Sequence, residues 1–113
     1  MKVVTLQVAS LDEVKRRAQD ASRGRKQGAR ITFASPELLF KLMTAKRWEL
    51  IRTITGAGPL TMREAARRVN RDVKAVHGDV QALLKAGVLQ KTANGNIIFP
   101  FDAIRVDVTL RAA

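Results

Sequence analysis

The residues with the clearest chemical potential lie in segment 73–86, whose polarity pattern is that of an amphipathic helix. On a wheel with about 100° per residue, the branched apolar side chains gather on one side: Val73, Val76, Val80, Leu83 and Leu84. The opposite side carries small or polar residues, with a histidine at its margin: Lys74, His77, Gly78, Gln81 and Lys85. A helix that docks by one face and enters the major groove of DNA with the other needs this division.

Three of these side chains have the hydrogen-bonding groups to reach base edges or phosphates: Lys74, His77 and Gln81. In the major groove, Gln favours adenine and Lys favours guanine. Ala75 and Gly78 are small enough for the helix backbone to approach the bases closely. The alternative is a surface helix whose polar face is only hydrated. Against it, a glycine inside a helix costs roughly 1 kcal/mol relative to alanine and adds no solubility.

The chain offers little to a metal ion or to a catalytic reaction. It has no cysteine, and His77 is its only histidine. Only Asp79 is a close carboxylate in sequence, so neither a ligand set nor an acid–base pair is recognisable. The phosphate-loop, serine-hydrolase and zinc-protease motifs are missing as well. We therefore expect a protein that is not an enzyme and that uses no metal or cofactor.

The flanking segments predict the elements that would position this helix. Thr61 and Glu64 form a capping box, which starts a shorter helix. That helix should bury Ala65, Ala66 and Val69. Asn70 then suits a left-handed turn position, Asp72 suits the cap of the next helix, and Gly87 ends that helix.

A β-hairpin should follow at 91–99, where Asn94 and Gly95 are typical of a type I′ turn. Helix, turn, helix and hairpin in this order predict a winged helix-turn-helix. Four arginines of the first helix and the turn would lie over the phosphate backbone: Arg63, Arg67, Arg68 and Arg71. Lys91 and Asn94 would contact the minor groove or a flanking phosphate. The alternatives are a hydrated basic helix face and a hairpin that only covers the core.

The first 34 residues predict a strand-helix-strand extension. Segments 2–8 and 31–33 are rich in residues that favour strands. Between them, Ser10 and Glu13 form a capping box, and residues 22–28 form a loop. The helix has a narrow apolar stripe of Leu11, Val14, Ala18 and Ala21. If the two strands are parallel, the crossover should be right-handed.

Two further helices should precede the helix-turn-helix. Ser35 and Pro36 start the first, and Thr44 caps the second. Their inward residues should be Leu38, Leu39, Leu42 and Met43 in the first helix, and Trp48, Ile51 and Ile54 in the second. Apolar and polar residues alternate over 104–110, which predicts a half-buried strand. This strand should pair with the N-terminal strand or with a second subunit.

The expected fold class is therefore α+β. Residues 1–34 would form an extension for dimerisation or partner binding. Residues 35–113 would form a winged helix-turn-helix DNA-binding domain with a C-terminal strand, and the boundary would lie near residues 33–36.

The charge of the chain points to a polyanionic partner. Of its 113 residues, 21 are Lys or Arg and 10 are Asp or Glu, which gives a formal charge of +11. Aromatic residues make up only 4%, too few for a reader of single strands that stacks bases. No apolar run reaches the roughly 18 residues of a membrane span, and no signal peptide is recognisable. We expect a cytoplasmic protein that binds double-stranded DNA.

Residues 42–50, 58–69 and above all RDVKAVHGDVQAL at 71–83 resemble a prokaryotic family of small winged-helix transcriptional regulators. That family is MarR-like in its DNA-binding part, and residues 100–104 resemble its closing motif. The chain departs from the family at Ala45, where Pro is common, at Trp48, where Leu is common, and at Gly78, where a larger polar residue is usual. The resemblance implies sequence-specific DNA binding with autoregulation. Members encoded beside a TumE-type toxin are read as antitoxins, so a toxin protein is an implied partner.

Two functions from different classes follow. The first is a transcriptional regulator, acting as a homodimer that places two copies of helix 73–86 in successive major grooves. The second is an antitoxin module that neutralises a partner toxin through its N-terminal segment. The basic patch of that segment would then take part: Lys15, Arg16, Arg17, Arg23, Arg25, Lys26 and Arg30. A hydrated helix face is the simpler interpretation of this patch, and RNA binding ranks third.

Overall fold

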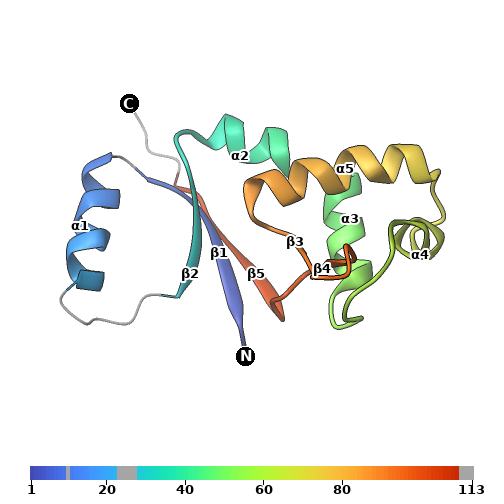
Figure 1. Ribbon diagram of the computed structural model, residues 1–113. Coiled ribbons are helices and arrows are strands. Elements are labelled where there is room, and N and C mark those ends of the chain that lie inside the picture. Colours follow the sequence, from blue (N-terminus) through green and yellow to red (C-terminus); the bar gives the residue numbers. More distant parts are fainter. Residues whose placement is uncertain (10, 23–27, 110–113) are drawn as a thin grey trace.

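Strands from both ends of the chain meet in one parallel sheet (Figure 1). The computed structural model describes residues 1–9, 11–22 and 28–109. β1 (Val3–Val8) pairs in parallel with β2 (Ala29–Phe33) on one side and with β5 (Ala103–Asp107) on the other. Of the two partners predicted for the C-terminal strand, the N-terminal strand is the one observed, and the predicted strand end at Leu110 lies outside the described residues.

α1 (Leu11–Ser22) connects β1 to β2, as the strand-helix-strand prediction required. The predicted cap Ser10 and loop residues 23–27 lie outside the described residues, as do the side chains of Leu11 and Ala21. Val14 is 40% exposed, and Ala18 is exposed as well. The described part of the apolar stripe of α1 therefore stays open to solvent.

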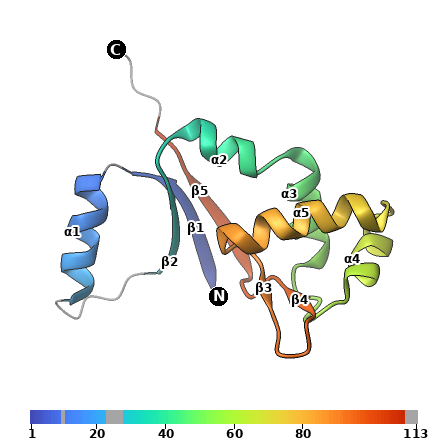
Figure 2. The same cartoon turned by 45° about the horizontal axis from the view of Figure 1, so that its top comes forward.

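The remaining helices lie across the sheet from α1 in both views (Figures 1 and 2). They are α2 (Pro36–Leu42), α3 (Ala45–Ile54), α4 (Met62–Arg68) and α5 (Val73–Ala86). β1 contributes Val4 and Leu6 to the hydrophobic core that these helices share. Sheet and helices are thus joined by one continuous core, and the described part of the chain has an α+β fold.

The helix starts follow the predicted caps. The Ser35 hydroxyl accepts from the amide of Leu38 at 3.3 Å, and the Thr44 hydroxyl accepts from the amide of Arg47 at 3.3 Å. Pro36 occupies the first turn of α2, where its missing N–H costs nothing. In α3, Ile51 and Ile54 are buried, and Trp48 is half-buried against the core.

The predicted inward face of α2 is wrong at Leu38. Leu39 and Met43 are buried and Leu42 packs against the core, but Leu38 is 50% exposed. The four residues span a broad arc of the helix surface, and Leu38 lies at its margin. The surface beneath this seven-residue helix covers only the rest of the arc.

The predicted hairpin joins β3 (Gln90–Lys91) to β4 (Ile97–Ile98), but its turn is not type I′. That turn needs positive φ at both central residues, and Gly95 has it (81°) whereas Asn94 does not. The amide of Gly95 donates to the carbonyl of Thr92 at 3.0 Å, and the amide of Thr92 donates to the carbonyl of Asn96 at 2.8 Å. This three-residue loop needs one left-handed residue, so Gly95 suffices.

Two other backbone predictions are confirmed. Asn70 has a φ of 53° between α4 and α5, and Gly87 has a φ of 87° at the end of α5. The amide of Val88 donates to the carbonyl of Leu83 at 3.0 Å, which closes the helix end. None of the helices in the described ranges combines the length and apolar character that crossing a membrane requires.

Candidate nucleic-acid interface

The side chains of α5 divide into a buried apolar face and an exposed polar face, as the sequence predicts. Val76, Val80 and Leu83 are fully buried. The residues expected to read DNA are all exposed: Lys74, Ala75, His77, Gly78 and Gln81. Val73, placed on the apolar side, is also partly exposed at the first turn. One face of α5 is therefore packed in the core, and its polar face is exposed to solvent over the length of the helix.

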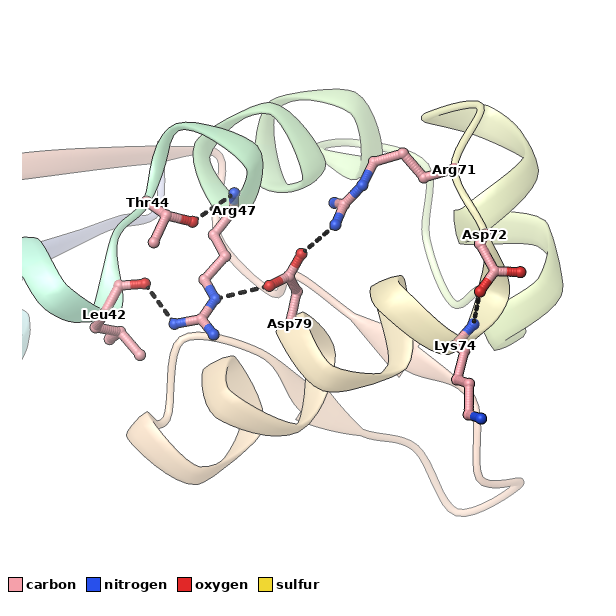
Figure 3. A network of polar contacts seen from close by, with 7 residues as sticks. All are labelled: Leu42, Thr44, Arg47, Arg71, Asp72, Lys74 and Asp79. Carbon is pink, nitrogen blue, oxygen red and sulfur yellow. Dashed lines mark hydrogen bonds and ion pairs between the residues drawn. The ribbon is translucent and has the colours of Figure 1, made fainter.

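The start of α5 is fixed by Asp72, whose carboxylate accepts from the amide of Lys74 at 3.2 Å (Figure 3). This confirms the predicted cap. Farther along, the side chains of His77 and Gln81 lie one turn apart, with 3.5 Å between His77 Nε2 and Gln81 Nε2. These two residues therefore present their polar groups side by side on the exposed face.

Asp79 joins α5 to the elements on either side of it (Figure 3). One carboxylate oxygen accepts from Arg47 Nε of α3 at 2.9 Å, and the other accepts from Arg71 Nη2 at 2.7 Å. Arg47 also donates from Nη1 to the carbonyl of Leu42 at 2.9 Å. This network holds the orientation of α5 relative to α3 and to the turn before α5.

The charge state of Asp79 follows from these contacts. Burial alone would raise the pKa of its carboxyl group. The hydrogen bonds from Arg47 and then Arg71, together with their positive charges, outweigh burial and lower the pKa below its ordinary value of 3.8. Asp79 is therefore ionised at neutral pH and pairs with both arginines.

Arg71 does not contribute an exposed side chain to the predicted phosphate clamp. Its side chain is only 17% exposed and is bound to Asp79. Its second terminal nitrogen, Nη1, is buried without a hydrogen-bond partner among the described residues. The carboxylate of Asp79, eight residues later, draws this guanidinium inward, so Arg71 serves the internal network.

The other three arginines of the predicted clamp lie on the surface of α4. Arg63 is exposed, and Arg67 and Arg68 pair with the carboxylate of Glu64. The amide of Glu64 donates to the Thr61 hydroxyl at 3.1 Å, so the Thr61 half of the predicted capping box is present. The other half is not, because among the described residues the carboxylate of Glu64 binds Arg67 and Arg68 and not the amide of Thr61. Because exposed ion pairs contribute little to stability, these arginines can exchange Glu64 for another anion at small cost.

The β3–β4 hairpin has a buried base and an exposed tip. The amides and carbonyls of Leu60 and Ile97 exchange two hydrogen bonds of 2.8 Å, and Ile97 is buried. Lys91 and Asn94 are exposed near the tip. The base of the hairpin therefore covers the core, which agrees with the alternative in which the hairpin is a cover. Its tip also exposes polar groups to solvent.

These elements lie close together. Figure 2 shows α4 beside the N-terminal end of α5, while the hairpin loop extends away from the helices. In both views α1, which carries Lys15 and Arg16 of the N-terminal basic patch, lies across the sheet from α5, and Arg30 belongs to β2 of the sheet itself. Arg30 donates to Gln7 at 2.8 Å. The other members, Arg17, Arg23, Arg25 and Lys26, fall outside what the structure describes of the side chains.

Sequence reasoning missed the pairing of Asp79 with Arg47, the two residues that join α3 to α5. They are 32 residues apart, and no local rule connects them. The available signal was the position of Asp79 one helical turn from the apolar Val76 and Leu83, at the margin of the buried face, where a solvated charge is uncommon. Within the described ranges, no three residues of the types that bind metal ions come together.

Fold and site together define a small α+β protein in which α5 has an exposed face that carries Lys74 and Lys85. A model of the family HVO_A0114 matches residues 42–106, more than half of the chain, and the protein belongs to that family. The matched region begins at the end of α2 and includes α3, α4, α5, the hairpin and most of β5. Neither a search of curated proteins nor a search of solved structures gave a match.

Proposed function

We propose that the protein is a sequence-specific, double-stranded DNA-binding regulator of transcription. In this proposal α4, the turn at Asn70 and α5 form a helix-turn-helix, and the β3–β4 hairpin is its wing. The observation that supports it most is the exposed face of α5, where Lys74, His77 and Gln81 surround the small Ala75 and Gly78. A helix with such a face fits a major groove about 12 Å wide.

The surrounding charges support the same function. Arg63 and Arg67 are exposed on α4, and Lys91 is exposed near Gln81 and Leu84 of α5. The one acidic residue within α5, Asp79, is paired with two arginines, and the carboxylate of Asp72 lies at the cap of the helix. The face that would meet DNA is therefore positive, which favours encounter with phosphates.

Base-reading and phosphate-binding residues should respond differently to substitution. We expect Gln81→Ala to relax the preference at one base pair while non-specific binding is kept. Arg63→Ala should weaken binding to all sequences alike and reduce the slope of log affinity against log salt by about 0.9. Electrophoretic titrations of selected and scrambled duplexes at several salt concentrations measure both effects. The same uniform loss from both variants would count against the proposal.

A second candidate function is an antitoxin module that covers an acidic toxin with its N-terminal segment. The open stripe on α1 favours it, since Val14 is 40% exposed and is followed by the exposed Lys15 and Arg16. Deleting the segment is a poor test, because Val4 and Leu6 belong to the core.

Val14→Asp is a better test of the second candidate, because this exposed position can accept a charge without loss of core packing. The variant should lose an acidic partner that co-purifies with the wild-type chain, while DNA binding is retained. Gly78→Glu, on α5, is the matched control and should retain that partner. A partner bound equally by Val14→Asp would exclude α1 as its site.

A further inference from the structure

The outer edge of β5 is open in the described part of the chain. The sheet order is β2-β1-β5, so β5 has a neighbour on one side only. The amide of Ala103 donates to the carbonyl of Lys2, and backbone groups alternate in direction along a strand. Residues 103, 105 and 107 therefore face β1, while Ile104 and Val106 direct their amides and carbonyls to the open side. Val108 is the first residue after β5 and would continue this alternation if the strand were extended by pairing.

Several side chains at this edge also lack packing or ion-pair partners among the described residues. Ile104 and Val108 pack against the core, but Val106 does not and is 42% exposed. Arg105 and Asp107 are exposed on the opposite face of the strand, and neither has an ion-pair partner within the described ranges. An apolar side chain and two unpaired opposite charges thus lie along one open row of hydrogen-bonding groups.

We propose that β5 pairs antiparallel with β5 of a second copy of this chain, about a two-fold axis at Val106. In that register Val106 lies opposite Val106, Ile104 opposite Val108, and Arg105 opposite Asp107. The backbone directions agree with it, because Ile104, Val106 and Val108 would form the hydrogen-bonded pairs. Arg105 and Asp107 would form the closer, non-hydrogen-bonded pairs, where opposite charges stabilise a sheet. The surface is complementary to itself, as a two-fold interface requires.

The other edge of the sheet lacks this property. β2 contains a single charged residue, Arg30, so no register of β2 against itself brings opposite charges together. Arg30 is also engaged with Gln7. Charges on an edge strand can instead protect a monomer from pairing. Such a protective role does not require opposite charges at positions 105 and 107. A monomeric wild-type chain in the experiment below would favour this role over dimerisation.

The pairing has a consequence for DNA that rests on the proposed function. A two-fold axis perpendicular to the sheet leaves α2–α5 of both copies on the same side of a six-stranded sheet. Two α5 helices would then be available to one duplex, as half-sites about 34 Å apart require. Because the strand contact is short, we expect a dissociation constant on the order of micromolar for the free dimer.

The test is a charge exchange measured by sedimentation equilibrium of the full chain over a range of concentrations. The wild type should reach twice the chain mass of 12.5 kDa. Arg105→Asp and Asp107→Arg should each raise the dissociation constant at least about tenfold, because each places like charges opposite one another twice per dimer. An equimolar mixture of the two variants restores both opposite-charge pairs and should regain the dimer, as should the double variant R105D/D107R.

Lys46→Asp, an equal charge change at an exposed position of α3, is the matched control and should dimerise like the wild type. Circular dichroism of each variant checks that it is folded. A monomeric wild type, or single variants that dimerise as well as the mixture, would overturn the proposed interface. The binding of Arg105→Asp to a DNA duplex with a single half-site distinguishes the two proposals. If this variant binds the half-site as the wild type does, the DNA-binding proposal stands even if the dimer interface is wrong.

Discussion

Replacing Asp79 by alanine should lower the free energy of unfolding by about 2–3 kcal/mol. Among the described residues, the substitution removes the one group that pairs with both Arg47 and Arg71, whose side chains are largely buried. Arg71 would keep its charge in a site where Nη1 already lacks a partner among the described residues. The loss should exceed that of an ordinary surface substitution, because a buried charge without a partner is more costly than the pair.

Urea denaturation followed by circular dichroism measures this effect. Glu64→Ala is the matched control, since Glu64 also bridges two arginines, Arg67 and Arg68, but on the surface. Its removal should change stability far less than Asp79→Ala does. Equal losses from the two variants would show that the Asp79 network does not hold α5 in place.

The contribution of Asp79 to the free energy of unfolding should decrease at low pH. The pKa of Asp79 is lowered in the folded chain, so its contribution is present above the ordinary value of 3.8 and is lost as pH falls through the lowered value. Asp79→Asn cannot titrate there. The stability difference between the wild type and Asp79→Asn should therefore narrow as pH falls from about 5 to about 2. A difference that stays constant over this range would contradict the assignment.

The features that the sequence predicts well are those set by neighbouring residues. Thr44, Thr61 and Asp72 cap helices because their side chains reach amides two or three residues away. The buried valines of α5 follow from helical periodicity alone. The ion pairs of Glu64 with Arg67 and Arg68 also obey a local spacing rule, and that rule could have predicted them.

The features that the sequence does not predict depend on distant elements. Arg71 and Arg67 are both arginines near the end of α4, and nothing in their local sequence distinguishes them. Arg71 is turned inward because it binds Asp79 of α5. Leu38 has the same apolar character as Leu39, and its exposure depends on how far the surface beneath α2 extends. The edge of β5 is visible only in the structure, since alternation along 104–110 predicts a strand but not which edge stays open.

The polar face of α5 gives the prediction with the largest expected effect on binding. Gly78→Glu should reduce affinity for duplex DNA at least about 30-fold, a penalty on the order of 2 kcal/mol. The new carboxylate would lie in the middle of the face that meets the phosphates and bases. Nothing lies within 4 Å of a Cβ at this position, and alanine or glutamate forms helix better than glycine. The loss should therefore occur without any loss of stability.

Gly78→Ala separates charge from size in this test. Its free energy of unfolding should rise by about 0.5–1 kcal/mol, because glycine is unfavourable inside a helix. Its affinity for DNA should fall much less than that of Gly78→Glu, since one methyl group carries no charge into the groove. Fluorescence anisotropy with a labelled duplex and thermal denaturation of both variants give the two quantities. If Gly78→Glu is stable and binds DNA as the wild type does, then the exposed face of α5 is not the surface that binds it, because no duplex could occupy that face without meeting the carboxylate.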